Sequence, residues 1–140
     1  MTKLDLATGS ALKKLSVNSN KLSTLDLSEQ NQLTYVDARH NNIAQLDITK
    51  SAALQTLLAD DNQLTELDTS DNTALIDLQL TSNKITSLDL INNSQLNYLY
   101  LHDNSLSQIN VSSIEQLYYF SLDRGVSCTG DMCSMAYYFN

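Results

Sequence analysis

The sequence has no proline and no tryptophan, and its 140 residues include only three glycines and two cysteines. Its apolar runs are a few residues long, which excludes a transmembrane helix, because crossing a bilayer takes about 20 apolar residues. The opening stretch MTKLDLATGS lacks the unbroken apolar segment of a secretory signal peptide. We therefore expect a folded chain that does not insert into a membrane and that, if exported, does not carry its own signal.

Positive charge is scarce as well. The chain has 8 Lys and Arg against 16 Asp and Glu, a formal net charge of −8 at pH 7. Nucleic acids and anionic lipids are bound by clustered basic residues, so we expect no nucleic-acid partner. The hydrophobic content of 42% is enough for one domain with a real core.

What the sequence does contain is a repeat of 21 residues without any insertion. One row of leucines comprises Leu12, Leu33, Leu54, Leu75, Leu96 and Leu117. A row of asparagines comprises Asn20, Asn41, Asn62, Asn83 and Asn104. A third row comprises Leu4, Leu25, Leu46, Leu67, Leu88 and Ile109. One repeat cannot bury its leucines alone, so the three rows predict a stack of repeats in which neighbouring layers stabilise each other.

Each unit reads roughly L-x-x-L-x-L-x-x-N-x-L-x-x-L-D-L-S, as in LNYLYLHDNSLSQINVS and LTYVDARHNNIAQLDIT. This pattern resembles the leucine-rich repeat family from Leu4 to about Leu122, and its period and LDLS-like second half are similar to bacterial internalin-type repeats. The resemblance implies an α/β-type solenoid, a right-handed superhelix of about six layers. A parallel β-sheet would line its concave side, with short strands or 3₁₀ turns on the convex side.

Alternation along the predicted strands divides core from surface. Leu99 and Leu101 point to one side, and Tyr98, Tyr100 and His102 point to the other. We expect the asparagine row to be a structural ladder, because an amide can donate to and accept from the backbone of adjacent turns. A row of carboxylates is expected to stabilise turns or face solvent, with a calcium ladder as the alternative. This row comprises Asp5, Asp26, Asp47, Asp68 and Asp89, and Asn110 completes it.

Lateral neighbours follow from the period by adding 21 to a residue number. This places opposite charges side by side and gathers Tyr98, Tyr100 and Tyr119 near the C-terminal end of the concave face. The expected charge pairs are Arg39 with Asp60, His40 with Asp61, His102 with Asp123, and Asp103 with Arg124. Tyrosine suits recognition because it combines a large contact area with a polar tip. The candidate partner-binding residues are Tyr35, Arg39, Tyr98, Tyr100, His102 and Tyr119.

Catalytic and metal sites are poorly supported. The one candidate triad is Ser121, His102 and Asp123, which we expect on an open face without an oxyanion pocket. His40 and His102 lie about three layers apart, roughly 14 Å, which is too far for a shared metal ion. We therefore expect no cofactor and no metal.

The prediction is a non-catalytic module of a bacterial exported or surface protein that binds a protein or glycan on its concave face. The alternative is an intracellular scaffold or regulatory subunit that docks a partner enzyme in the cytoplasm.

Both ends depart from the repeat. The stretch KLDLATGSALKKL is half a repeat, so either the chain is cut from a longer protein or a flanking domain or another chain covers that edge. At the other end Gly125 replaces the ladder asparagine, which divides the chain into a solenoid over 1–125 and a C-terminal cap or stub over 126–140. Cys128 and Cys133 could close a disulfide loop, as in an exported protein, or remain two reduced thiols that plug the core.

Overall fold

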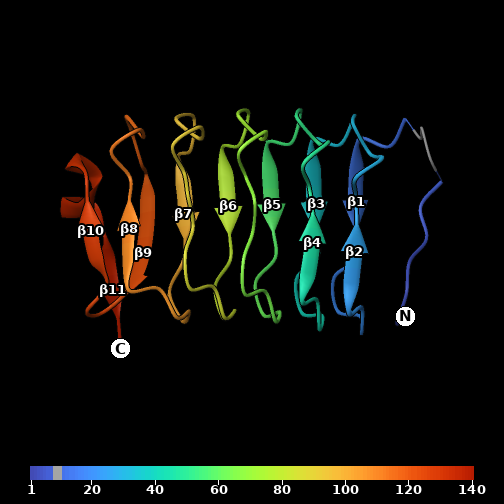
Figure 1. The fold of residues 1–140 in the computed structure, drawn as a ribbon, viewed down its shortest axis with the longest axis horizontal. Helices are drawn as coiled ribbons and strands as arrows, with labels where there is room; N and C mark the ends of the chain where they lie inside the picture. The colour runs from blue at the N-terminus through green and yellow to red at the C-terminus, as the bar shows by residue number, and fades with distance from the viewer. Residues whose placement is uncertain (8–10) are drawn as a thin grey trace.

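The computed structural model describes residues 1–7 and 11–140 as a stack of short parallel strands, one layer per repeat (Figure 1). The main sheet has seven strands. In spatial order they are β1 (Lys14–Ser16), β3 (Tyr35–Asp37), β5 (Thr56–Leu58), β6 (Asp77–Gln79), β7 (Tyr98–Tyr100), β9 (Tyr119–Asp123) and β11 (Tyr137–Phe139). From β1 to β9 paired residues are 21 positions apart, as in Lys14 with Tyr35 and Tyr98 with Tyr119. The predicted parallel-strand solenoid of about six turns is confirmed.

The return half of each repeat runs in the opposite direction on the other side of the core (Figure 1). Two small parallel sheets form there, one of β2 (Thr24–Asp26) with β4 (Gln45–Asp47) and one of β8 (Gln108–Asn110) with β10 (Ser127–Thr129). We call the outward side of the seven-stranded sheet the sheet face and the opposite side the back face. The one helical element of the described residues is a 3₁₀ turn, η1 (Asp131–Met135), so none of them forms a helix that could cross a membrane.

The core lies between the two faces and is built from rows of equivalent residues. One row follows the middle of the strands, and its members from Val36 to Phe120 are fully buried. The next row inward runs from Val17 to Leu122 and includes the small residues Ala38 and Ala59. Burying one leucine or isoleucine contributes about 1.5–3 kcal/mol, so several per layer offset the entropy lost when the layer becomes ordered.

The asparagine row bridges successive layers at the corner that follows each sheet strand. The Asn62 amide donates to the carbonyl oxygens of Ala59 and Ala38 at 3.1 and 3.0 Å. Its Oδ1 accepts from the backbone N–H of Ile43 at 2.9 Å. The same three-way pattern recurs at Asn41, Asn83 and Asn104. Each of these four asparagines therefore joins its own turn to two backbone groups of the preceding layer.

A second corner, at the end of the return half, carries a different row of buried polar residues. Ser51 Oγ donates to the Gln30 carbonyl, and the Asn72 amide donates to the carbonyls of Ile48 and Ser51. Asn93 repeats this arrangement one layer on, and its Oδ1 also accepts from Thr69 Oγ1 at 2.8 Å. This row does not stand out in the sequence, because its residue type changes from layer to layer.

The aspartate row caps the turns that lead into this second corner. Oδ1 of Asp26 and of Asp47 accepts from the backbone N–H two residues on, at 2.9 and 3.0 Å. Asp68, Asp89 and Asn110 do the same. These contacts give the row the turn-stabilising role that the sequence predicts. Among the described residues no group of three or more Asp, Glu, His or Cys side chains is placed to hold a metal ion.

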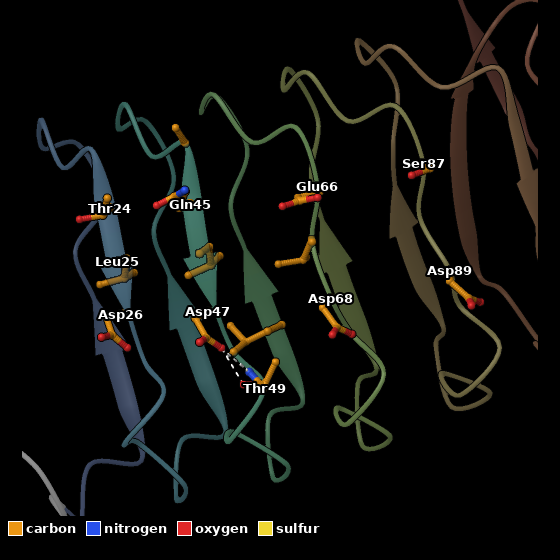
Figure 2. Close-up of a pocket in the computed structure, with 14 residues that line it drawn as sticks. Thr24, Leu25, Asp26, Gln45, Asp47, Thr49, Glu66, Asp68, Ser87 and Asp89 are labelled. Atoms are coloured by element: carbon orange, nitrogen blue, oxygen red, sulfur yellow. Dashed lines mark hydrogen bonds between the residues drawn. The ribbon is translucent and has the colours of Figure 1, made fainter.

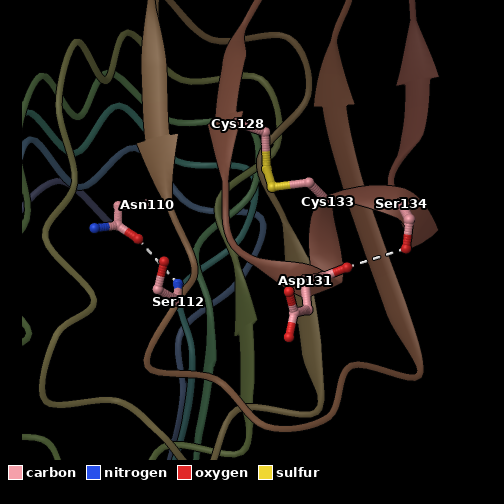
Figure 3. The surroundings of a disulfide bond; sticks show 6 residues. All are labelled: Asn110, Ser112, Cys128, Asp131, Cys133 and Ser134. Carbon is pink, nitrogen blue, oxygen red and sulfur yellow. Dashed lines mark hydrogen bonds between the residues drawn. A yellow bond between two sulfur atoms is a disulfide. The ribbon is translucent and has the colours of Figure 1, made fainter.

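The C-terminal segment adds one shortened layer to the solenoid. β10 pairs with β8, β11 pairs with β9, and η1 joins them, with Cys128 bonded to Cys133 (Figure 3). Gly130 is required here, because its φ is +118° and a Cβ atom would lie 2.7 Å from the backbone nitrogen of Ser112. The final fifteen residues therefore extend both faces rather than only closing the core.

At the N-terminal end the half repeat lies against the first full layer. The Met1 ammonium donates to Asn20 Oδ1 at 3.1 Å, in the position that a backbone N–H occupies in the other layers. Leu4, Leu6 and Leu12 are partly buried against the core. Residues 8–10 of this half repeat lie outside the described residues.

Candidate recognition surface

The sheet face is formed by alternate residues of the seven strands, so each strand contributes two or three side chains to it. Its first layers are polar and are tied together by hydrogen bonds. Arg39 forms a bidentate pair with Asp37, with Nε to Oδ1 at 3.0 Å and Nη2 to Oδ2 at 2.9 Å, and Asn18 donates to the same carboxylate. Asp37 is only 3% exposed. The Arg39 hydrogen bonds hold the pKa of Asp37 below its usual value, against the opposing effect of burial.

The predicted charge pairs are only partly formed. His40 and Asp61 do lie side by side, with Nδ1 to Oδ2 at 3.0 Å. The prediction that Arg39 pairs with Asp60 is wrong, because the carboxylate of Asp37, two residues away on the same strand, holds the guanidinium in a bidentate geometry. Register fixes which Cα atoms are neighbours, but it does not fix which acceptor a long side chain reaches.

The two charge pairs expected in the last layers are replaced by other contacts. Asp123 accepts the backbone N–H groups of Asp103 and Asn104 at 2.7 and 3.0 Å, instead of pairing with His102. Asp103 in turn accepts from Ser82 Oγ and forms no ion pair with Arg124 among the described residues. Asp123 thus takes the place of the backbone carbonyls that accept the corresponding N–H groups in earlier layers, such as those of Ser82 and Asn83.

His102 and Ser121 are brought together, but not as an exposed catalytic pair. His102 Nδ1 lies 2.8 Å from Ser121 Oγ, and the imidazole stacks on the Phe139 ring with centroids 4.1 Å apart. Ser121 has no exposed surface, so the prediction that it lies on an open face is wrong. β11 pairs alongside β9 and puts Tyr137 next to Ser121, and the His102 ring lies against the Ser121 hydroxyl.

The tyrosines form a stacked row rather than a loose cluster. The rings of Tyr100 and Tyr119 are 4.4 Å apart with an interplanar angle of 21°, and those of Tyr119 and Tyr137 are 5.3 Å apart at 17°. These residues come from the adjacent strands β7, β9 and β11, so the Tyr119 ring lies between the other two. Tyr98, paired with Tyr119 by Cα register, instead packs its ring against Tyr118 at 5.9 Å.

Of the predicted binding residues, four gather at the C-terminal end and two do not. Tyr98, Tyr100, His102 and Tyr119 lie on β7, β9 or the turn after β7, within contact distance of other aromatic rings. Tyr35 and Arg39 lie several layers away, at the polar end. Three aromatic residues of the surface were missed: Tyr118, Tyr137 and Phe139. Tyr137 pairs with Ser121, 16 positions earlier, so a search at a spacing of 21 does not find it. The aromatic run Tyr137–Phe139 after Gly130 was the available signal.

Between the polar and aromatic ends lie two carboxyls without an ion-pair partner among the described residues. Asp60 accepts the Thr81 N–H at 2.8 Å, and Asp77 accepts from the Gln79 side-chain amide at 3.1 and 3.2 Å. Burial raises the pKa of both carboxyls. The pKa of the Tyr100 phenol is raised too, first by burial and next by the Asp77 carboxylate.

The back face contains an open groove of about 900 Å³ (Figure 2). It crosses four layers, and its walls carry the turn aspartates together with Glu66, Thr24 and Gln45. No basic or aromatic side chain lines it. Oδ1 of each turn aspartate accepts a hydrogen bond within its own turn, as described above. The groove offers no enclosed site.

The comparisons with known proteins agree with this architecture. Residues 95–117 match the family model described as Leucine Rich Repeat. The structure is similar to the functional domain of InlJ from Listeria monocytogenes, which includes a cysteine ladder, with 25% identity and a TM-score of 0.71 over 92% of this chain and 37% of that chain. It is also similar in fold to InlF, an internalin from Listeria monocytogenes, with 21% identity and a TM-score of 0.70 over 92% of this chain and 43% of that one. The chain thus spans less than half the length of either structure. No curated protein matches its sequence.

Proposed function

We propose that this leucine-rich-repeat chain, with its internalin-like fold, is a non-catalytic recognition module that binds a protein or a glycan on its sheet face. The observation that carries the proposal is the stacked row Tyr100, Tyr119 and Tyr137, flanked by Tyr98 and Tyr118. Stacked rings lose little rotamer entropy on binding and present a large preorganised contact area.

A catalytic role has little support in the same region. A serine nucleophile must be reached by substrate, whereas Ser121 is fully buried on β9, between the neighbouring strands β7 and β11. The third group of a triad must orient the histidine, whereas the Asp123 carboxylate is occupied by two backbone N–H groups.

We further propose that the module is part of a bacterial exported or surface protein. The Cys128–Cys133 disulfide supports this proposal, because disulfides persist in oxidising compartments and are rare in the cytosol. Thiol titration of protein purified without reductant is the test. Two reactive thiols per chain would contradict export and favour the intracellular scaffold.

The binding surface is tested by changing Tyr98, Tyr100 and Tyr119 together to Ala. The variant should lose capture of a ligand from host-cell surface extracts or from a glycan array, while its far-UV circular dichroism stays that of the parent. A matched control changes Thr24, Gln45 and Glu66 on the back face to Ala and should bind normally. Retained binding in the tyrosine variant would place the site elsewhere.

A further inference from the structure

The aromatic row presents ring edges and hydroxyl groups to solvent more than ring faces. Tyr119 is covered on both sides, at 4.4 Å by Tyr100 and at 5.3 Å by Tyr137, with interplanar angles of 21° and 17°. A sugar ring that stacks on an aromatic side chain needs an open face, because the attraction is to the electron-rich face of the ring. The middle of the row therefore offers no platform for a sugar.

One ring in the row keeps a face toward the centre of the sheet. Tyr100 is covered by Tyr119 on the β9 side, and on its other side lies β6, whose Gln79 is its register partner. β6 also carries Asp77, whose register partner on β7 is Tyr98, two residues before Tyr100, and the Asp77 carboxylate contributes to the raised pKa of the Tyr100 phenol. An aromatic ring and a carboxylate thus border the same part of the sheet face.

Among the residues that the structure describes, none forms an ion pair with the Asp77 carboxylate. Asp77 is half-buried, and its hydrogen bonds come from the neutral amide of Gln79. Arg39 acts on Asp60 one layer before Asp77, but its guanidinium is held in the bidentate pair with Asp37. The face at β5 and β6 therefore carries two partly buried carboxylates that are hydrogen-bonded but form no ion pair among the described residues, which is complementary to a basic side chain and not to an acidic one.

We propose that β6 and β7 are the docking centre for a basic segment of a protein partner, whose Lys or Arg side chain pairs with Asp77 and lies over the side of the Tyr100 ring that faces β6. This inference rests on the proposed function and deepens it, because it selects a protein over a glycan as the ligand. A cation over an aromatic face and an ion pair with a partly buried carboxylate each add severalfold in affinity.

Two peptides that differ only in charge test the chemistry: tetra-arginine amide and its neutral isostere tetra-citrulline amide. Titrated into the ¹⁵N-labelled full chain, tetra-arginine should shift the backbone amide signals of β6 and β7 and bind at least about fivefold more tightly than tetra-citrulline. Asp77→Asn should weaken tetra-arginine binding by at least about fivefold. The matched control, Asp68→Asn, removes the same charge from an exposed turn on the back face and should change the affinity by less than about twofold.

Equal losses of tetra-arginine affinity in Asp77→Asn and Asp68→Asn would overturn the inference. The peptide would then be attracted only by the net charge of −8. The inference would also be overturned by an oligosaccharide that shifts the β6 and β7 signals when tetra-arginine does not, although the proposed function would then stand. A protein ligand that is lost by the Tyr98, Tyr100 and Tyr119 triple variant but bound normally by Asp77→Asn would likewise refute only the cation contact. A ligand that is bound normally by both variants would refute the proposed sheet-face site itself.

Discussion

The two corners of each repeat satisfy buried backbone groups in different ways. At the ladder corner an asparagine occupies every layer from Asn20 to Asn104, and its amide uses both donors and its acceptor. At the second corner the same position is Gln, Ser, Asn, Asn and finally Ile, and Oδ1 of Asn72 has no partner. An invariant residue is needed only where one side chain must bridge three chain segments. Where it caps one or two carbonyls, several residue types suffice.

The largest expected effect comes from the middle of the ladder. Asn62→Ala removes four hydrogen bonds and leaves the Ile43 N–H buried without an acceptor, so the free energy of unfolding should fall by about 3 kcal/mol. Urea denaturation measures this loss. The matched control is Asn20→Ala, at the exposed end of the same row, with an expected cost of about 1 kcal/mol. Equal costs would show that the ladder does not act between layers.

Substitutions at the second corner should lower the free energy of unfolding by less than substitutions in the ladder. Thr69→Val keeps the shape of the side chain but removes the hydroxyl that donates a hydrogen bond to Asn93 Oδ1. We expect the free energy of unfolding to fall by about 1–2 kcal/mol. The equivalent position one layer earlier is Ile48, which already has no hydroxyl to offer Asn72. Ile48→Thr should therefore be tolerated better than Ile43→Thr, at an equally buried site. The opposite ranking would mean that Asn72 Oδ1 needs no donor.

The corners should also differ in their response to acid, because the ladder is built from neutral amides and the turns into the second corner from carboxylates. Hydrogen bonds from Ser28 and Ser70 lower the pKa of Asp26 and Asp68 in the folded state. Their stabilising effect is complete above the unfolded pKa, about 3.9, and is lost as the pH falls through the folded pKa. Asp26→Asn with Asp68→Asn should therefore flatten the acid limb of a stability–pH profile. The control Asp71→Asn, at an exposed site, should leave the acid limb steeper than the double variant does.

The smallest expected effect concerns the residues that precede the ladder asparagines. They have left-handed backbone angles, with φ between 54° and 60° at Ser19, His40, Asp61, Ser82 and Asp103. Ser19→Asn should raise the free energy of unfolding by about 0.5 kcal/mol, because asparagine tolerates this conformation better than serine. A slightly higher thermal midpoint would show this gain. Ser16→Asn, on the extended strand β1, should give no gain.

These comparisons also show what the sequence could predict. The period of 21 identified the strands, the core rows and the ladder, because every layer from Lys14 to Asp123 keeps the same spacing. It could not place Tyr137 or Phe139, since the last layer is five residues shorter (21 − 16 = 5). It also could not predict that Tyr119 stacks on Tyr100 rather than on Tyr98, because Cα register leaves the side-chain rotamers open. The second corner was missed because its residue type varies.

The stacked tyrosines give the molecule an optical property of its own. The chain has seven tyrosines and no tryptophan, so its ultraviolet emission comes from tyrosine alone. Five of the seven belong to the contacting rings on and beside β7, β9 and β11. Because rings in contact can exchange excitation energy, we expect most of the emission of the chain to come from this patch. A ligand bound on the sheet face, or separation of β11 from β9, should therefore change the intrinsic fluorescence of the unlabelled protein.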